Sequence, residues 1–218
     1  MTSQPLTHRI TARTALIRGL LCLLCMAVAA LAVPQAHARK IDTVVIDAGH
    51  GGFNLGQRNG QVYEKWLALD VSLRLDKYLR KKGVKTVLTR RSDVFISLPE
   101  RVRIANRYSK NSIFVSVHFN GASNRNAHGL ETFHYSRNSK ELAARIQTEI
   151  VRATRRRDRG VKQARFHVIR NTKQQAVLVE CGFLTNAREL KLCKTGKYRQ
   201  AMAEAIGRGV LKHLKAIN

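Results

Sequence analysis

Apolar residues along this chain follow two different spacings, and each spacing predicts one kind of secondary structure. Short apolar runs predict buried strands at residues 43–47 (TVVID), 85–89 (KTVLT), 113–117 (IFVSV) and 176–179 (AVLV). Residues 130–135 (LETFHY) alternate between apolar and polar side chains, which predicts a further strand. These five segments are therefore expected to form the sheet of the protein.

Between the strands, apolar residues recur at helical spacing. In residues 64–82, Leu67, Val71 and Leu75 are four positions apart, and Gly83 supplies a stop signal. The same reasoning predicts helices at residues 97–108, 139–155, 187–192 and 198–217.

Strands that alternate with helices are typical of an α/β fold. We expect a single, mostly parallel, twisted sheet flanked by helices on both faces, because parallel apolar strands need covered crossover connections. No linker-like, repetitive or low-complexity tract interrupts residues 39–218, which favours one domain. In such sheets, ligands bind beyond the carboxyl ends of the strands.

The first 38 residues have the pattern of a secretory signal peptide. Arg9, Arg13 and Arg18 precede an uncharged apolar run at residues 19–33, and an Ala-His-Ala motif ends at Ala38. The run is shorter than the roughly 20 apolar residues of a spanning helix, so cleavage is favoured over a retained anchor. We therefore expect export, a mature chain of residues 39–218, and no transmembrane segment after cleavage.

The charge of the chain is strongly positive. It has 40 Lys+Arg against 14 Asp+Glu, a formal net charge of +26, yet 44% of its residues are hydrophobic, which excludes a disordered polycation. Export favours an anionic envelope polymer over nucleic acid as the partner of this surface, and no nucleic-acid motif is present. Export also permits a disulfide between Cys181 and Cys193, with two free buried thiols as the equal alternative.

Four side chains that could bind a metal ion or transfer a proton are expected at one edge of the sheet. His50 follows the first strand, His118 and Glu180 directly follow the predicted strands 113–117 and 176–179, and Glu64 opens the first helix. Each alone could be structural, but a carboxylate at the end of a buried strand needs a partner. Four such residues at one edge indicate a site.

This set of residues matches the chemistry of catalytic zinc. Such zinc sites take three ligands, His-His-Glu among them, and keep a position for water, while a separate carboxylate can carry the proton. The spacing leaves open whether Glu64 or Glu180 is the ligand. His128 and His134 are competing ligands, which we expect at the surface or in a supporting position.

Segments in a fixed order along the chain resemble the zinc-dependent N-acetylmuramoyl-L-alanine amidases of the amidase-3 family. They are VVIDAGHGG, YEK, LTR, LPERVRIAN, SVHFN, GLETF, RGVKQARFHVIRNT and VLVECGFLTNARE, and together they cover nearly all of residues 43–217. The resemblance implies that His50, Glu64 and His118 bind Zn²⁺ and that Glu180 is the catalytic carboxylate. It assigns Asn120 a role in contacting substrate or orienting His118.

The resemblance also implies a function. The family hydrolyses the amide bond between N-acetylmuramic acid and L-alanine of the peptidoglycan stem peptide, so we expect a monomeric envelope enzyme in the periplasm, with secretion to the cell wall as the alternative. Two rival functions remain: another zinc-dependent peptidoglycan peptidase, and a non-catalytic wall-binding module. Some division-associated relatives carry a helix that plugs the zinc site. Here only residues 136–138 separate the strand 130–135 from the next helix, which predicts an open site.

Overall fold

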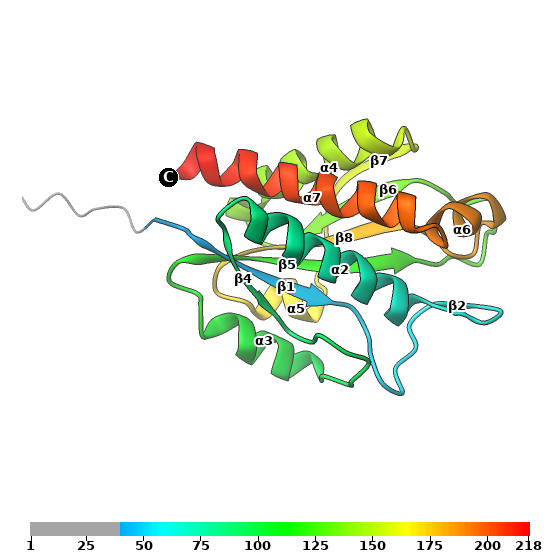
Figure 1. Cartoon of the computed structure of the whole chain (residues 1–218), viewed down its shortest axis with the longest axis horizontal. Helices are drawn as coiled ribbons and strands as arrows, with labels where there is room; N and C mark the ends of the chain where they lie inside the picture. The colour runs from blue at the N-terminus through cyan, green and yellow to red at the C-terminus, as the bar shows by residue number, and fades with distance from the viewer. Residues whose placement is uncertain (1–39) are drawn as a thin grey trace, which may run out of the picture. The chain divides into compact units, whose positions relative to one another are not determined.

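The computed structural model describes residues 40–218, and the predicted signal peptide lies outside them. Six strands form one sheet in the order β4-β1-β5-β8-β6-β7 (Figure 1). The strands are β1 (Thr43–Ala48), β4 (Lys85–Leu88), β5 (Ser112–Asn120), β6 (Leu130–His134), β7 (Asp158–Gln163) and β8 (Gln175–Phe183). All neighbouring pairs are parallel except β6 and β8. The prediction of a mostly parallel sheet is confirmed.

Helices cover both faces of this sheet, as the apolar strand sequences require. One face packs against α2 (Glu64–Lys81), α4 (Lys140–Thr154) and α7 (Gly196–Ile217), and the other against α3 (Leu98–Asn106) and α5 (His167–Asn171). Strand β1 has apolar side chains on both faces. Val44 and Ile46 belong to the core under α2, α4 and α7, whereas Val45, which points to the opposite side, belongs to the core under α3 and α5.

The remaining elements are short. A hairpin of β2 (Arg58–Asn59) and β3 (Val62–Tyr63) precedes α2, and α6 (Ala187–Cys193) precedes α7. A single 3-10 turn at Arg137–Ser139 joins β6 to α4, so the described chain has no plug helix at this connection, as predicted. None of the helices within residues 40–218 is long and apolar enough to cross a membrane.

Several sequence predictions need correction. The pattern missed β7 and α5, and it ended β5 and β8 too early: His118 and Glu180 lie inside their strands rather than after them. Backbone pairing continues past an apolar run because it does not depend on side-chain polarity. His134, expected at the surface or in support of the site, is only 8% exposed, and its Nδ1 forms a hydrogen bond with the Ser136 carbonyl oxygen at 3.1 Å.

The two cysteines of the described chain are both free and buried. Of the two alternatives left open by the sequence, the structure contains the thiols rather than the disulfide. Cys181 lies in β8 and Cys193 ends α6, and both belong to the larger of the two hydrophobic cores. They act as small apolar core residues.

Candidate metal centre

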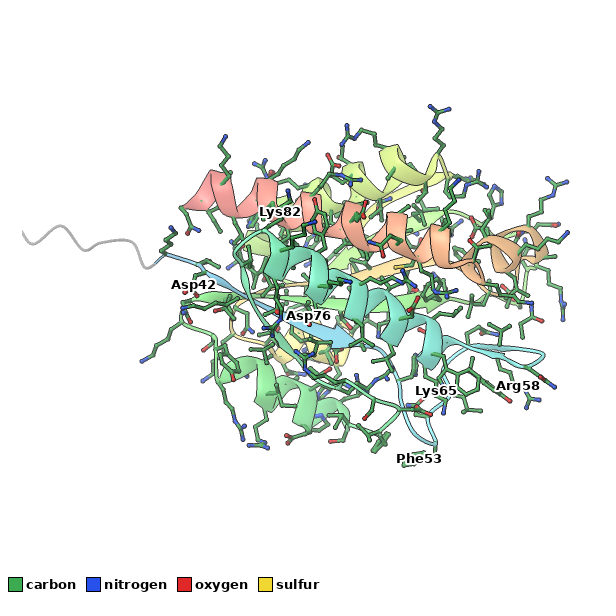
Figure 2. All side chains as sticks on the ribbon, in the orientation of Figure 1. Asp42, Phe53, Arg58, Lys65, Asp76 and Lys82 are labelled. Carbon is green, nitrogen blue, oxygen red and sulfur yellow. The ribbon has the colours of Figure 1, made fainter. Side chains whose placement is uncertain are left out.

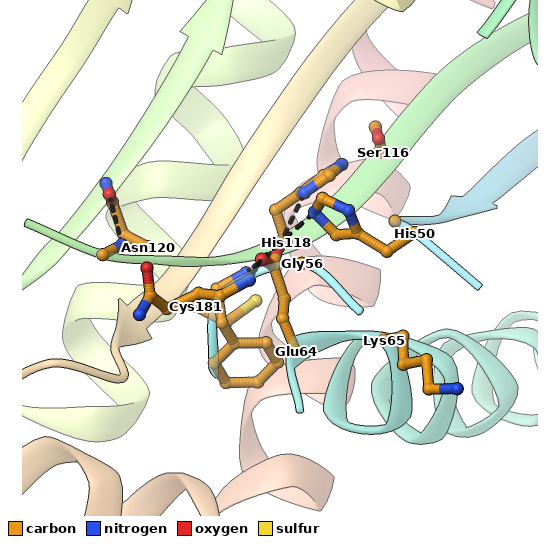
Figure 3. Close-up of polar contacts among 12 residues, drawn as sticks. His50, Gly56, Glu64, Lys65, Ser116, His118, Asn120 and Cys181 are labelled. Carbon is orange, nitrogen blue, oxygen red and sulfur yellow. Dashed lines mark hydrogen bonds and ion pairs between the residues drawn. The ribbon is translucent and has the colours of Figure 1, made fainter. Parts of the chain in front are cut away.

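The structure brings His50, Glu64 and His118 together at the carboxyl ends of β1 and β5. Each offers one ligand atom, and these atoms all lie within 4.8 Å of one another. Figure 3 shows the two imidazole rings converging on the Glu64 carboxylate. His50 Nε2 lies 3.1 Å from Glu64 Oε2, and His118 Nδ1 lies 2.8 Å from Glu64 Oε1.

Glu64 is placed at the first residue of α2 by the β2–β3 hairpin. Its side chain is 5% exposed. Besides the histidines, Glu64 Oε2 accepts a hydrogen bond from the Gln57 backbone amide at 2.8 Å and Oε1 accepts one from the Phe119 amide at 3.0 Å. Burial alone raises the pKa of this carboxyl, but hydrogen bonds from His118 and from the protonated form of His50 outweigh it, so the pKa lies well below its ordinary value. Glu64 is therefore ionised.

His50 has a donor arrangement that suits a shared cation. Asn54 Oδ1, which also accepts from the Gly56 amide, can only accept, so His50 Nδ1 donates its proton to it at 2.8 Å. In the neutral ring, the lone pair of Nε2 then faces the carboxylate oxygen of Glu64. Two acceptors at 3.1 Å repel unless a cation or a proton lies between them. The donor set of two imidazoles and one carboxylate therefore fits zinc.

Two glycines make room for these side chains. A Cβ added to Gly49 would lie 2.5 Å from His118 Cε1, and one added to Gly56 would lie 2.5 Å from Glu64 Oε2. Gly56 also has a φ of +67°, a conformation that favours glycine. The loop that carries His50 is thus packed directly against the other two residues of the site.

Two buried arginine side chains donate hydrogen bonds to the backbone of the same loop. Arg101 is 3% exposed, and it donates to the carbonyls of Ala48 and His50, both at 2.6 Å, and to Asp47 Oδ1 at 2.8 Å. Arg90 donates to the Gly49 carbonyl at 2.7 Å. The buried Asp47 also accepts from Ser116 and Thr89. The position of His50 therefore depends on a buried ionic network that links β1, β5 and α3.

Glu180 lies beside this centre without taking part in its hydrogen bonds. It is the register partner of His118 on β8, it is 9% exposed, and its Oε2 has no hydrogen-bond partner within the described chain. Burial raises the pKa of this carboxyl well above its ordinary value, and the nearby carboxylates Glu64 and Glu131 raise it further. Such a group can hold a proton near neutral pH and release it to a neighbour.

Sequence reasoning gave no role to Glu131, the register partner of Glu180 on β6. Glu131 is 4% exposed, and it accepts from Arg159 at 2.9 Å, from Lys162, and from Asn120 Nδ2 at 2.6 Å. The signal was available, since a carboxylate inside a predicted buried strand needs partners. Asn120 is thus engaged with Glu131, and its predicted role toward substrate remains a prediction.

A cavity of about 340 Å³ adjoins the candidate metal centre. It is lined by both candidate histidines together with apolar residues of α3 and of the segment before it, including Phe95, Ile96 and Leu98. His128 lies outside it and is exposed in a loop, which agrees with its predicted position at the surface.

Comparisons with known proteins agree with this geometry. The family model N-acetylmuramoyl-L-alanine amidase (Amidase_3) matches residues 44–212. Relatives include the amidase LytC of Bacillus subtilis, 36% identical over 80% of this chain and 36% of LytC, so this chain spans about a third of its length. The uncharacterized protein YqiI of the same organism is 38% identical over 77% of this chain and 82% of its own.

Solved structures give the same result. The N-acetylmuramoyl-L-alanine amidase from Clostridium difficile 630 superposes with a TM-score of 0.78 at 38% identity, covering 81% of this chain and 98% of that one. AmiC2 of Nostoc punctiforme superposes with a TM-score of 0.76 at 37% identity, covering 79% and 97%. The resemblance drawn from the sequence is confirmed, and this chain belongs to the amidase-3 family of N-acetylmuramoyl-L-alanine amidases.

Proposed function

We propose that this chain is a zinc-dependent enzyme that hydrolyses the amide bond between N-acetylmuramic acid and L-alanine in peptidoglycan. The observation that carries the proposal is the convergence of His50, Glu64 and His118 beside the buried carboxylate of Glu180. The family model and the relatives named as amidases support the choice of bond.

His50, Glu64 and His118 would hold the Zn²⁺ ion. Ligands at ordinary zinc distances in a tetrahedral site lie roughly 3.3 Å apart, close to the 3.1 Å and 2.8 Å that separate the histidine nitrogens from the Glu64 oxygens. When bound, zinc supplies a Lewis acid that polarises a carbonyl oxygen and lowers the pKa of a water molecule.

Glu180 is the proton carrier in this proposal. Its unpaired Oε2 takes the proton of the attacking water and then gives that proton to the alanine nitrogen as the C–N bond breaks. A raised pKa suits this second step, because the acid form must be accessible at neutral pH. Asn54, Arg90 and Arg101 orient the His50 loop, and Glu131 lies opposite Glu180 on β6.

The cellular setting follows from the same proposal. The segment 1–38 directs export, and the mature chain acts as a monomer on peptidoglycan in the periplasm. N-terminal sequencing of the exported protein tests the export step: a mature terminus at Arg39 is expected, and retention of Met1 would contradict it. The basic surface of the protein adheres to anionic envelope polymers.

Digestion of purified peptidoglycan, with and without a zinc chelator, tests the activity. We expect chelator-sensitive release of intact stem peptides with a free L-alanine amino group, identified by mass spectrometry. Cleavage inside the stem peptide would instead assign a zinc peptidase. The absence of any cleavage by a folded, zinc-loaded chain would favour a wall-binding module.

A further inference from the structure

A second cavity of the described chain shares no lining residue with the metal centre, and seven of its fifteen lining residues are Arg or Lys. It measures about 870 Å³ and is formed by the loop after β5, the end of α4 and helix α6. Its positive side chains belong to Arg125, residues 155–157, Arg188, Lys191 and Lys194. Three segments far apart in the sequence therefore contribute charge to one concave surface.

These cations have no anionic partners of their own. None of the seven takes part in an ion pair within residues 40–218, whereas Arg74, Arg80 and Arg199 on other surfaces are paired with aspartates. The only acidic side chain that lines the cavity is Glu189. It is buried, and its two oxygens accept hydrogen bonds from the backbone amides of Gly129 and Phe183 at 2.9 and 2.8 Å.

Hydrogen bonds fix the segments that carry the charges. Asn186 caps α6 by accepting from the amides of Arg188 and Glu189, and its Nδ2 donates to the carbonyl of Arg125 at 3.0 Å. On the opposite wall, the Arg157 carbonyl accepts from the Leu130 amide at 2.9 Å. Arg155 has a left-handed backbone, with a φ of 51°, where the chain leaves α4. The cluster is thus built on a fixed backbone.

The side chains indicate the class of ligand. The guanidinium group presents a planar fork of donors that matches phosphate oxygens, and five of the seven cations are arginines. No Phe, Tyr or Trp lines the cavity, and His128 is its one aromatic ring, so it offers little of the aromatic platform on which nucleic-acid bases stack. We therefore expect this cavity to recognise negative charge rather than to stack against aromatic rings of a ligand.

We propose that this cavity binds a phosphate-bearing polymer without aromatic rings, of the kind that lies beside peptidoglycan in the bacterial envelope. The choice of an envelope polymer rests on the proposed function. None of the residues that line the cavity belongs to the proposed hydrolytic site. The proposal therefore locates binding of an anionic polymer in this cavity instead of over the whole basic surface.

The test measures binding of inorganic polyphosphate to the full chain and to two variants that each lose three positive charges. The cavity variant carries Arg125→Gln, Arg157→Gln and Arg188→Gln. The control variant carries Lys77→Gln, Lys81→Gln and Lys82→Gln, which are exposed and unpaired in the described structure. In Figures 1 and 2, Lys82 follows the end of α2 that lies far from α6. Thermal unfolding establishes that both variants are folded.

We expect the cavity variant to lose at least about fivefold in affinity and the control less than about twofold, with binding that weakens as salt is added. An equal loss in both variants would overturn the proposal, since it would mean adhesion by net charge alone. Tighter binding of polyuridylate than of polyphosphate would also overturn it. The Glu180→Gln variant separates the two proposals, because it should lose hydrolysis and keep polyphosphate binding.

A second measurement uses the unmodified chain, so it does not depend on the folding of a variant. Phenylglyoxal reacts with exposed arginines, and peptide mapping locates the adducts. Polyphosphate should protect Arg157 and Arg188, while Arg107, exposed and unpaired on the α3 side, should stay reactive. Equal protection of all three would contradict a localised site.

Discussion

His118 and Glu180 are register partners on the adjacent parallel strands β5 and β8. Partners in a sheet project their side chains to the same face, so a candidate metal ligand and a carboxylate with an unpaired oxygen lie side by side. Glu131 continues the row on β6. This row of three polar side chains places the proposed proton carrier next to the metal centre without a direct contact to Glu64.

The Glu180→Gln substitution tests the proton-carrying role. Glutamine keeps the shape of the side chain but cannot carry a proton, so we expect turnover on peptidoglycan to fall about 100-fold or more. Zinc content and the unfolding temperature should be retained. Glu141→Gln, at an exposed glutamate of α4, is the matched control and should leave turnover unchanged. Near-normal rates in Glu180→Gln would remove Glu180 from the proposed mechanism.

Gly56→Ala tests how tightly the metal centre is packed. The new methyl group would lie 2.5 Å from Glu64 Oε2 and 2.6 Å from His50 Cδ2. We expect zinc affinity, measured by competition with a chromogenic chelator, to fall about 10-fold or more. Gly60→Ala is the control: its φ of +60° is similar, but nothing lies within 4 Å of the added carbon. Both variants carry the backbone cost of about 1–2 kcal/mol, so equal zinc affinities would contradict the packing argument.

Arg101→Ala tests the buried ionic network that positions the His50 loop. Removal of this guanidinium leaves Asp47, whose side chain is 1% exposed, without its ionic partner. Breaking such a pair costs about 3–5 kcal/mol, which urea unfolding would detect. Zinc affinity should fall as well, because Arg101 holds the His50 carbonyl. Arg103→Ala removes an exposed arginine of the same helix and should scarcely change the urea midpoint.

Glu149 predicts a loss of stability in acid. Burial raises the pKa of this carboxyl, but hydrogen bonds from Lys212, Arg152 and Arg208 outweigh it and lower the pKa from 4.5 to about 2. A lowered pKa contributes stability above the unfolded-state value of 4.5, and this contribution is lost as the pH falls from 4.5 toward 2. The three cations are partly exposed, so we expect about 2 kcal/mol.

Thermal unfolding of the wild type and of Glu149→Gln, at neutral pH and near the lowered pKa, measures this contribution. The wild type should be more stable at neutral pH, and the difference should shrink in acid, where its carboxyl is also protonated. A difference that is independent of pH would show that the ion pairs contribute nothing measurable.

The sequence by itself determined most of the elements and their order. The spacing of Leu67, Val71 and Leu75 predicts an amphipathic helix, and short runs rich in β-branched residues such as TVVID favour buried strands, so these elements form at the predicted places. The order of strands and helices, with the chemistry of two histidines and two glutamates, also located the candidate site. These features depend on local side-chain patterns, which a sequence displays directly.

Only the tertiary structure decided the features that depend on long-range contacts. Strand β7 (DRGVKQ) has no apolar pattern and exists because it pairs with β6. The roles of Glu131 and Arg101 arise from hydrogen bonds to residues distant in the sequence, and the basic cavity gathers three separate segments. Such contacts leave no local periodicity, because the free energy that favours them comes from pairing and burial in the assembled fold.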